Sequence, residues 1–334
     1  MADLQGMDDC VRIAAVDLGT VSSRLALARV RDGRIVELTK HSVITDMGRG
    51  VDASGAFDAA AIERVEAACA QFAEEARTFG AAATCVTLTS AARDASNAEE
   101  LLDRLAALGF IPQVIPGEVE ARLTFYGVAH DFPGERIAVA DPGGGSTEIV
   151  VGSYLPDAAA LELERVHSFN IGCRRLTDRF FTADPPEASE LDAAARWAYD
   201  QFATYWSGLG ELPARLISVG GTVTTLVALE HELVPYDSDF VHLRELSLDA
   251  VERQLGRMQG LTVAQIMQLK GMQAKRAPMM LAGSVIIREL MRSGGYRALT
   301  VSESSLLAGV VATVDETMRG EAPVVGWTPA LAQL

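Results

Sequence analysis

Short apolar runs alternate with longer amphipathic stretches along the chain. Val11–Asp17 and Leu25–Val30 are typical of strands, and Asp32-Gly33 predicts a turn into a third strand, Ile35–Ile44. Phe57–Phe79 has apolar side chains on one face at helical spacing, and Gly80 marks its end. Further strands are predicted at Thr84–Leu88, Phe110–Ile115, Ile137–Ala140, Ile149–Gly152, Ala160–Phe169, Leu216–Val219 and Ala298–Val301. Further helices are predicted at Glu118–Val128, Arg174–Phe180, Glu187–Trp206, Thr224–Glu230 and Ser304–Met318. Another is predicted to begin at the N-cap Asn97 and to end at Gly109, and more helix is predicted between the acidic loop Val234–Asp239 and Met291.

The stretch from Val139 to Glu148 combines a strand end with three glycines. Asp141 closes one apolar run, Gly143-Gly144-Gly145 follow, and Glu148 opens the next run. Such a pattern predicts a β-hairpin, in which consecutive glycines let backbone N–H groups converge on an anion. The flanking carboxylates suit a hard divalent cation that phosphate oxygens would share. A triple glycine alone would favour a turn that binds nothing, but the added Asp, Ser, Thr and Glu favour phosphate chemistry here.

An earlier stretch has the same organisation as this hairpin. Asp17-Leu18-Gly19-Thr20 also follows an apolar run and precedes another, so an Asp-x-Gly turn between strands occurs twice. The repeat indicates a duplicated unit of strands followed by helix. The sequence therefore predicts an α/β protein of two similar lobes that face a cleft.

Composition and charge narrow the classes of function. The chain has 334 residues, enough for two domains, and 49% of them are apolar. A formal net charge of −16 argues against nucleic-acid and membrane partners, because both need a basic surface. The N-terminus shows no apolar signal segment, which predicts a cytoplasmic protein. The dispersed cysteines are expected to be reduced and mostly buried: Cys10, Cys69, Cys85 and Cys173.

Five motifs in order give the chain a family resemblance: the two Asp-x-Gly hairpins, Thr89–Ala95, Pro116–Arg122 and Gly220-Gly221-Thr222. The chain resembles the exopolyphosphatase/guanosine pentaphosphate phosphohydrolase family, short two-domain type, of the actin-like ATPase and sugar-kinase superfamily. The likeness runs from Val11 to about Ala312. It implies two ribonuclease-H-like domains facing a central cleft, formed by 1–120 plus 304–334 and by 121–303. Similar proteins are dimers, so a homodimer is expected.

The chemistry that this resemblance implies is hydrolysis of a terminal phosphoanhydride. Glu120 matches the family's catalytic glutamate, which would orient and deprotonate water. Magnesium (Mg²⁺) would be held by Asp17, Asp141 and Glu148. Substrate phosphate would be bound by Gly19, Thr20, Ser22, Arg93, Gly143, Gly144, Gly145, Ser146, Thr147, Gly220, Gly221 and Thr222.

Simpler interpretations of three of these positions remain open on sequence grounds. Glu120, like Glu118, could be a solvated glutamate in the first turn of a helix, where the helix dipole favours acids. Arg93 could pair with the nearby Asp94 or Glu99. The glycine turn at Gly220 could serve close packing alone.

The chain also departs from the family pattern at three places. Val21 stands where the family usually has asparagine, Asp46 where it usually has arginine, and Ser302–Gly309 lacks the usual glycine and glutamate. A carboxylate near a polyanion is repulsive unless a metal intervenes, so these changes predict a shifted substrate preference.

Three functions remain in consideration on sequence grounds. The first is release of terminal phosphate from inorganic polyphosphate, and the second is hydrolysis of guanosine pentaphosphate. The third is a non-catalytic polyphosphate or nucleotide sensor. A nucleotide base would need an apolar slot, for which Phe125, Tyr126 and Phe240 are candidates.

Overall fold

The computed structural model describes residues 10–334. The prediction that the N-terminus carries no apolar signal segment concerns residues 1–9 as well, which lie outside the described residues. The chain divides into two compact units. Among the described residues, unit 1 comprises those up to His130, Leu155–Leu161 and Leu306–Leu334, and unit 2 comprises Asp131–Tyr154 and Glu162–Ser305. Within residues 10–334, none of the helices combines the length and apolar character needed to cross a membrane.

Unit 1 is built on a five-stranded sheet in the order β3-β2-β1-β4-β5. Its strands are β1 (Val11–Leu18), β2 (Ser22–Arg31), β3 (Arg34–Ile44), β4 (Ala83–Leu88) and β5 (Pro112–Val114). The first three form an antiparallel meander, and β1, β4 and β5 run parallel. β1 and β4 are buried along most of their length because helices cover both faces of the sheet.

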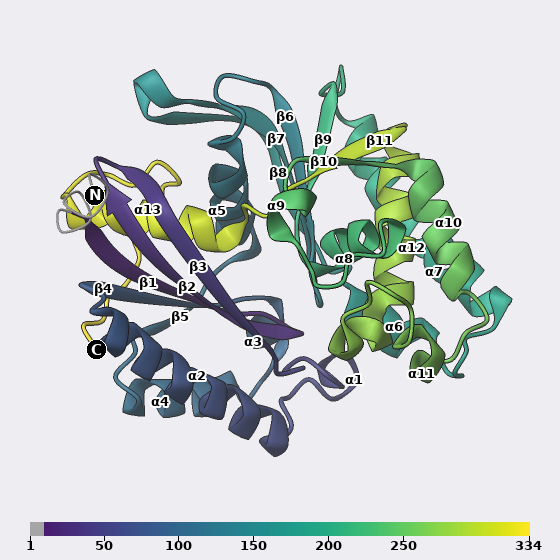
Figure 1. Ribbon diagram of the computed structural model, residues 1–334, viewed down its shortest axis with the longest axis horizontal. Coiled ribbons are helices and arrows are strands. Elements are labelled where there is room, and N and C mark those ends of the chain that lie inside the picture. Colours follow the sequence, from purple (N-terminus) through teal and green to yellow (C-terminus); the bar gives the residue numbers. More distant parts are fainter. Residues whose placement is uncertain (1–9) are drawn as a thin grey trace. The chain divides into compact units, whose positions relative to one another are not determined.

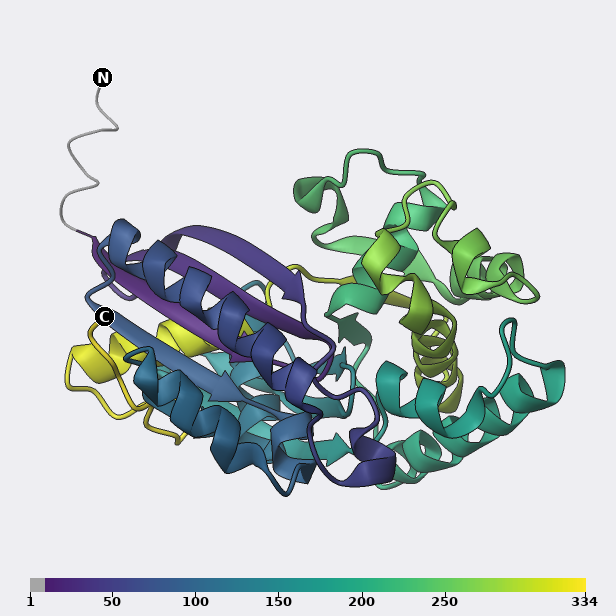
Figure 2. The ribbon, with the colours of Figure 1, turned by 90° about the horizontal axis from the view of Figure 1, so that it is seen from below.

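The helices of unit 1 lie in two layers (Figure 1). α2 (Ala59–Phe79) and α4 (Ala98–Ala107) cover one face, and Figure 2 shows α2 lying along the strands. α5 (Gly117–Ala129) and α13 (Leu306–Met318) pack together on the other face. The short helices α1 (Val51–Ser54) and α3 (Ser90–Asp94) complete the unit.

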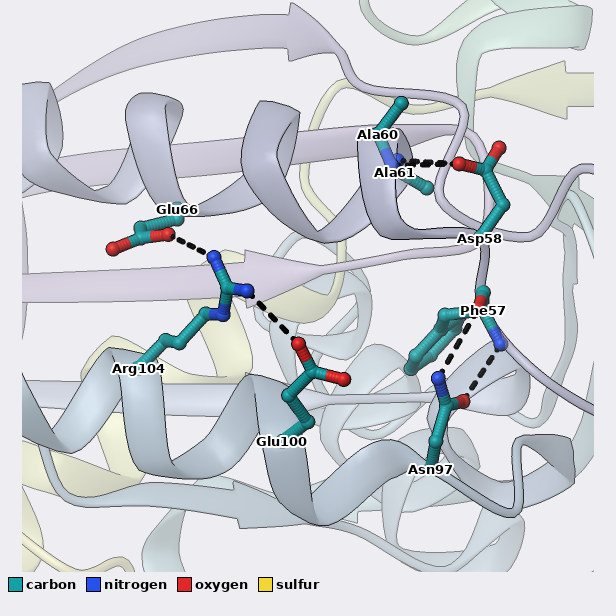
Figure 3. Close-up of polar contacts among 8 residues, drawn as sticks. All are labelled: Phe57, Asp58, Ala60, Ala61, Glu66, Asn97, Glu100 and Arg104. Carbon is teal, nitrogen blue, oxygen red and sulfur yellow. Dashed lines mark hydrogen bonds and ion pairs between the residues drawn. The ribbon is translucent and has the colours of Figure 1, made fainter.

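The start of α4 shows how unit 1 is tied together (Figure 3). Asn97 stands at the N-cap position, as predicted, but its side chain makes no capping bond. Its amide group instead donates to Phe57 O at 3.1 Å and accepts from Phe57 N at 2.8 Å, across 40 residues. The predicted cap is therefore wrong in its role, because a long-range backbone partner takes both ends of the amide. Arg104 of α4 links this helix to α2 through Glu66 at 2.8 Å.

Unit 2 repeats the arrangement with one strand more. Its six-stranded sheet has the order β10-β11-β9-β6-β7-β8. The strands are β6 (Ile137–Pro142), β7 (Thr147–Leu155), β8 (Ala160–Phe169), β9 (Arg215–Ser218), β10 (Arg244–Ser247) and β11 (Ala298–Val301). β10 was expected to be helical; it pairs antiparallel with β11 at the sheet edge, a partner that no local pattern reveals.

The helices of unit 2 are grouped around α12 (Ala277–Ser293), which contacts α6, α7, α8 and α10 (Figure 1). Most of its residues are buried, which explains its apolar sequence. The other elements are α6 (Cys173–Phe180), α7 (Ala188–Ser207), α8 (Gly221–Glu230), α9 (Ser238–Val241), α10 (Leu248–Met258), α11 (Val263–Ile266) and the 3₁₀ turns Pro156–Ala158 and Ala274–Arg276.

The two sheets share one strand order. The series β3-β2-β1-β4-β5 of unit 1 corresponds to β8-β7-β6-β9-β11 of unit 2. In both series the first hairpin pair is antiparallel and the next two pairs are parallel: β1 with β2, β4 with β1 and β5 with β4 in unit 1, and β6 with β7, β9 with β6 and β11 with β9 in unit 2. The predicted α/β fold with two similar ribonuclease-H-like domains is confirmed by this correspondence. In each unit the glycine hairpin joins the central strand to its antiparallel neighbour.

Candidate active site

The hairpin of unit 1 is closed by a bond from Gly19 N to Ser22 O at 3.0 Å. The next two carbonyls are also occupied, since Thr20 O accepts from Gly48 N at 2.8 Å and Val21 O from Asp46 N at 2.9 Å. Because a trans peptide carries its N–H opposite its C=O, the following amides point away from the Asp46–Gly48 loop. Turn and loop are in close contact: a Cβ on Gly48 would lie 2.2 Å from Thr20 Cγ2.

The hairpin of unit 2 is closed in the same way, by Gly143 N and Ser146 O at 2.9 Å. The carbonyls of the three glycines accept from the start of α6: Gly143 O from Cys173 N, Gly144 O from Arg174 N at 2.8 Å, and Gly145 O from Arg175 Nε at 2.9 Å. The peptide geometry therefore turns the amides of Gly144, Gly145 and Ser146 to the opposite side. In the described part of the chain these three amides donate to no backbone oxygen. Amides grouped in this way can bind an anion, which stays the role that the sequence predicts for this hairpin.

The residue across from each hairpin aspartate differs between the units. Asp17 lies opposite Arg24, and Asp141 lies opposite Glu148, at the same spacing along the chain. Arg24 donates to Asp17 Oδ2 through Nε at 2.9 Å and Nη2 at 2.5 Å, so this aspartate is already neutralised. In unit 2 two carboxylates face one another instead, which favours a cation.

Asp17 is 1% exposed, and its second oxygen, Oδ1, has no hydrogen-bond partner among the described residues. The role predicted for Asp17 at the metal stays a prediction. Arg24 was missed by the sequence analysis, although the hairpin register already places it opposite Asp17.

The pair Asp141 and Glu148 has the chemistry that Mg²⁺ requires. Both side chains are buried, at 7% and 2% exposure, and come from paired positions on β6 and β7. Within residues 10–334, no three His, Cys, Asp or Glu side chains gather into a metal cage. Mg²⁺ is commonly held by one or two carboxylates, with water and substrate phosphate as its other ligands. These two residues therefore fit a magnesium ion that is completed by substrate.

Hydroxyl groups hold the strand that carries Glu148. Ser168 Oγ donates to Glu148 Oε1 at 2.6 Å, and Thr147 Oγ1 donates to Ile171 O at 2.5 Å. The predicted phosphate ligand Thr147 thus uses its hydroxyl proton within unit 2. Ser168 had no distinguishing signal in the sequence, because it lies within an unremarkable strand.

Glu120 lies in the first turn of α5 and is only 7% exposed. Its Oε2 accepts from Arg93 Nη1 at 2.8 Å, and the same nitrogen donates to Ile115 O at 3.0 Å. Glu120 is therefore no solvated surface glutamate, whereas Glu118 is exposed. Arg93 therefore has Glu120 as an ion-pair partner, beyond the Asp94 and Glu99 that the sequence suggested.

The glycine turn before α8 makes two close contacts. Gly220 has φ 91°, and a Cβ there would lie 3.0 Å from Asp141 Oδ1, so glycine lets the backbone approach this carboxylate. A Cβ on Gly221 would overlap the guanidinium of Arg276, at 1.6 Å from Nη1. Thr222 is buried against Gly283. Arg276 therefore brings a cation to the turn, a contact across 55 residues that sequence reasoning missed.

The three aromatic side chains predicted as candidates for a nucleotide-base slot are each in contact with other groups of the protein. Phe125 is fully buried, and Tyr126 is 4% exposed with its hydroxyl donating to Glu316 Oε1 at 2.5 Å. Phe240 has Arg244 over its ring at 3.8 Å and His231 at its edge. Within the described residues, Phe125 and Tyr126 belong to the packing of unit 1.

Comparison with known proteins identifies phosphatases as relatives of this chain. The model of the Ppx/GppA phosphatase family matches residues 26–316. Exopolyphosphatase 2 of Mycobacterium tuberculosis is 34% identical over 90% of this chain and 97% of its own length. The guanosine-5'-triphosphate,3'-diphosphate pyrophosphatase of Photobacterium profundum is 28% identical over 92% of this chain but only 60% of its own length.

A solved structure shares the fold over its whole length. The crystal structure of the Aquifex aeolicus member of the Ppx/GppA family has a TM-score of 0.76 and 28% identity, covering 93% of this chain and 99% of that one. The resemblance seen in the sequence is thereby confirmed, and the two-unit fold is that of the actin-like superfamily. The chain belongs to the Ppx/GppA phosphatase family.

Proposed function

We propose that this protein is a phosphoanhydride hydrolase that releases terminal orthophosphate from inorganic polyphosphate. The observation that carries the proposal is the hairpin of unit 2, where amides of Gly144–Ser146 face away from α6 beside the carboxylates of Asp141 and Glu148. Phosphoryl transfer needs neutralised phosphate oxygens and a positioned water rather than covalent work by the protein. The hairpin supplies donors for the phosphate and ligands for a cation.

The proposed roles follow from this arrangement. Gly143–Thr147 and the Gly220–Thr222 turn, with Arg276 beside it, would hold phosphate oxygens in unit 2. Gly19, Thr20 and Ser22 would do so in unit 1. Mg²⁺ bound at Asp141 and Glu148 would neutralise developing charge on the phosphate, and Asp17 is the metal ligand proposed in unit 1. Glu120, held by Arg93, would orient and deprotonate the attacking water.

Of the two candidate substrates, we propose inorganic polyphosphate before guanosine pentaphosphate. The exopolyphosphatase relative is matched along nearly all of its length, whereas the guanosine relative is matched along three fifths. The buried state of Phe125 and Tyr126 also removes two of the three aromatic candidates for a base slot. We further propose that the protein acts as a homodimer in the cytoplasm, on its family likeness and its acidic composition.

The test measures phosphate release from long polyphosphate, tripolyphosphate, guanosine pentaphosphate and ATP, with magnesium and with EDTA. We expect magnesium-dependent release from polyphosphate and a fall of roughly 10²–10⁴-fold in Glu120→Gln. Glu118→Gln, two residues away and exposed, is the matched control and should retain activity.

Three outcomes would contradict the proposal. Full activity in Glu120→Gln would remove that residue from the catalytic role. Cleavage of guanosine pentaphosphate alone would reverse the order of the substrates. Tight binding of polyphosphate without turnover would favour the sensor.

A further inference from the structure

The hydroxyl of Ser168 is placed to control the direction of the Glu148 carboxylate. Ser168 lies on β8, the strand next to β7, and its Oγ donates to Glu148 Oε1 at 2.6 Å. A hydrogen bond to an ionised acceptor is shorter and stronger than one between neutral groups. Glu148 is 2% exposed, so an ordered donor inside the protein takes the place of water around this oxygen.

Ser168 is itself rigidly supported. Side chains alternate along a strand, and its neighbours His167 and Phe169 point together, with ring centroids 4.2 Å apart. Phe169 meets Phe202 and Tyr205 of α7 edge to face, at 5.4 Å and 5.9 Å. These ring contacts hold one face of β8 in place. Ser168 lies on the opposite face of the strand, where it meets Glu148.

A second bond fixes the register between the two strands. Thr147 Oγ1 donates to Ile171 O at 2.5 Å, so the residue before Glu148 is tied to the segment just after β8. The neighbouring strands that carry Ser168 and Glu148 are therefore tied by two hydrogen bonds, one of which ends on a backbone carbonyl. Groups that orient a metal ligand work best on such rigid elements.

We propose that Ser168 is a positioning residue that directs the Glu148 carboxylate toward the divalent cation. The inference rests on the proposed function, in which Glu148 holds magnesium. Ser168 touches neither substrate nor metal; it acts through Glu148. Loss of its hydroxyl leaves the carboxylate in place but with more than one accessible orientation, which weakens the binding of the ion.

The experiment uses Mn²⁺ alone as the probe, bound to the full-length protein and followed by electron paramagnetic resonance. We expect Ser168→Ala to weaken Mn²⁺ binding by about tenfold, the lower end of what loss of such an orienting group costs. Ser168→Thr keeps the hydroxyl and should restore binding. The control is Ser153→Ala, which replaces another serine in β7, the strand that carries Glu148. This substitution should leave Mn²⁺ binding unchanged.

A double-mutant cycle separates positioning from general support of the fold. In a Glu148→Gln background, Ser168→Ala should have no further effect on Mn²⁺ binding, because it acts through that carboxylate. The magnesium concentration for half-maximal phosphate release should rise in Ser168→Ala by the same factor as the Mn²⁺ dissociation constant.

Two results would overturn the inference. One is unchanged Mn²⁺ affinity in Ser168→Ala with a lowered free energy of unfolding, which would make the bond purely structural. The other is the absence of Mn²⁺ binding in the unsubstituted protein, which would also remove Glu148 from the metal. Failure of the proposed function would look different: no phosphate release from any polyphosphate, whatever the affinity for Mn²⁺.

Discussion

Arg93 Nη1 lies 2.8 Å from Glu120 Oε2 and 3.0 Å from Ile115 O, so one nitrogen joins the proposed catalytic carboxylate to the segment before α5. Arg93 comes from the last turn of α3 and Glu120 from the first turn of α5. The side chain that the sequence assigned to substrate phosphate thus also orients the residue proposed to activate water.

We predict that Arg93→Lys lowers kcat by roughly 10²-fold, because a shift of about 1 Å in a catalytic group can cost that much. A lysine reaches less far and cannot reproduce the guanidinium geometry. Steady-state kinetics on polyphosphate distinguish the two roles of Arg93. Positioning of Glu120 lowers kcat, whereas loss of a phosphate contact alone would raise KM with kcat unchanged. Arg196→Lys, at an exposed arginine of α7, is the control.

Removal of Arg24 should destabilise unit 1. Asp17 is 1% exposed, and its Oδ1 already lacks a hydrogen-bond partner among the described residues. Without Arg24, its Oδ2 also loses the ion pair, so the buried carboxylate charge is left uncompensated. We expect Arg24→Ala to lower the free energy of unfolding by about 3 kcal/mol, as for other broken buried pairs. Urea denaturation measures the change. Asp17→Asn combined with Arg24→Met should recover most of the loss; equal instability of the single and double variants would contradict this account.

The glycine before α6 should be essential to the hairpin of unit 2. A Cβ on Gly172 would lie 2.2 Å from Gly144 O, so Gly172→Ala forces the loop away from α6. We expect a loss of about 1–3 kcal/mol in the free energy of unfolding. The rate of phosphate release should fall as well, because the loop amides move.

Gly256→Ala is the matched control for this substitution. Gly256 lies in the exposed face of α10 with nothing within 4 Å of an added Cβ. Alanine there should raise the free energy of unfolding by about 0.5–1 kcal/mol, since glycine is costly inside a helix. Opposite signs for the two glycines, read from urea denaturation, check the prediction.

Alkaline pH should destabilise the protein through its buried thiols. Burial raises the pKa of Cys173 from 9.0 to about 11 and that of Cys85 to about 12. Between pH 9 and 11 the unfolded chain releases these protons while the native chain keeps them, so stability falls as pH rises. For Cys173 the loss amounts to about 3 kcal/mol.

Unfolding free energies between pH 8 and 11 test this dependence. Cys173→Ala should show a shallower decline with pH than the unsubstituted protein, even if it is less stable at pH 8. Parallel curves would contradict the prediction. Among the cysteines of residues 10–334, only the half-exposed Cys10 should react readily with a thiol reagent at pH 8.

Much of the fold follows from local pattern. The strands β8 and β11 begin and end where the alternation of residues predicts, and α2 ends at Gly80, whose φ of 71° suits glycine. The two hairpins could be recognised as repeats because turn and strand signals are set by neighbours a few residues apart. β10 was missed because its pairing partner, β11, lies far along the chain.

The sequence by itself determined most of the elements, the duplication and the chemical type of the site residues Glu120, Asp141 and Glu148. Only the tertiary structure decided their partners. Arg93 meets Glu120 across 27 residues, Ser168 meets Glu148 across 20, and Arg276 covers Gly221 across 55. The physical reason is range: turns and helix ends depend on adjacent residues, whereas the contacts that orient a buried carboxylate arise when separate elements pack together.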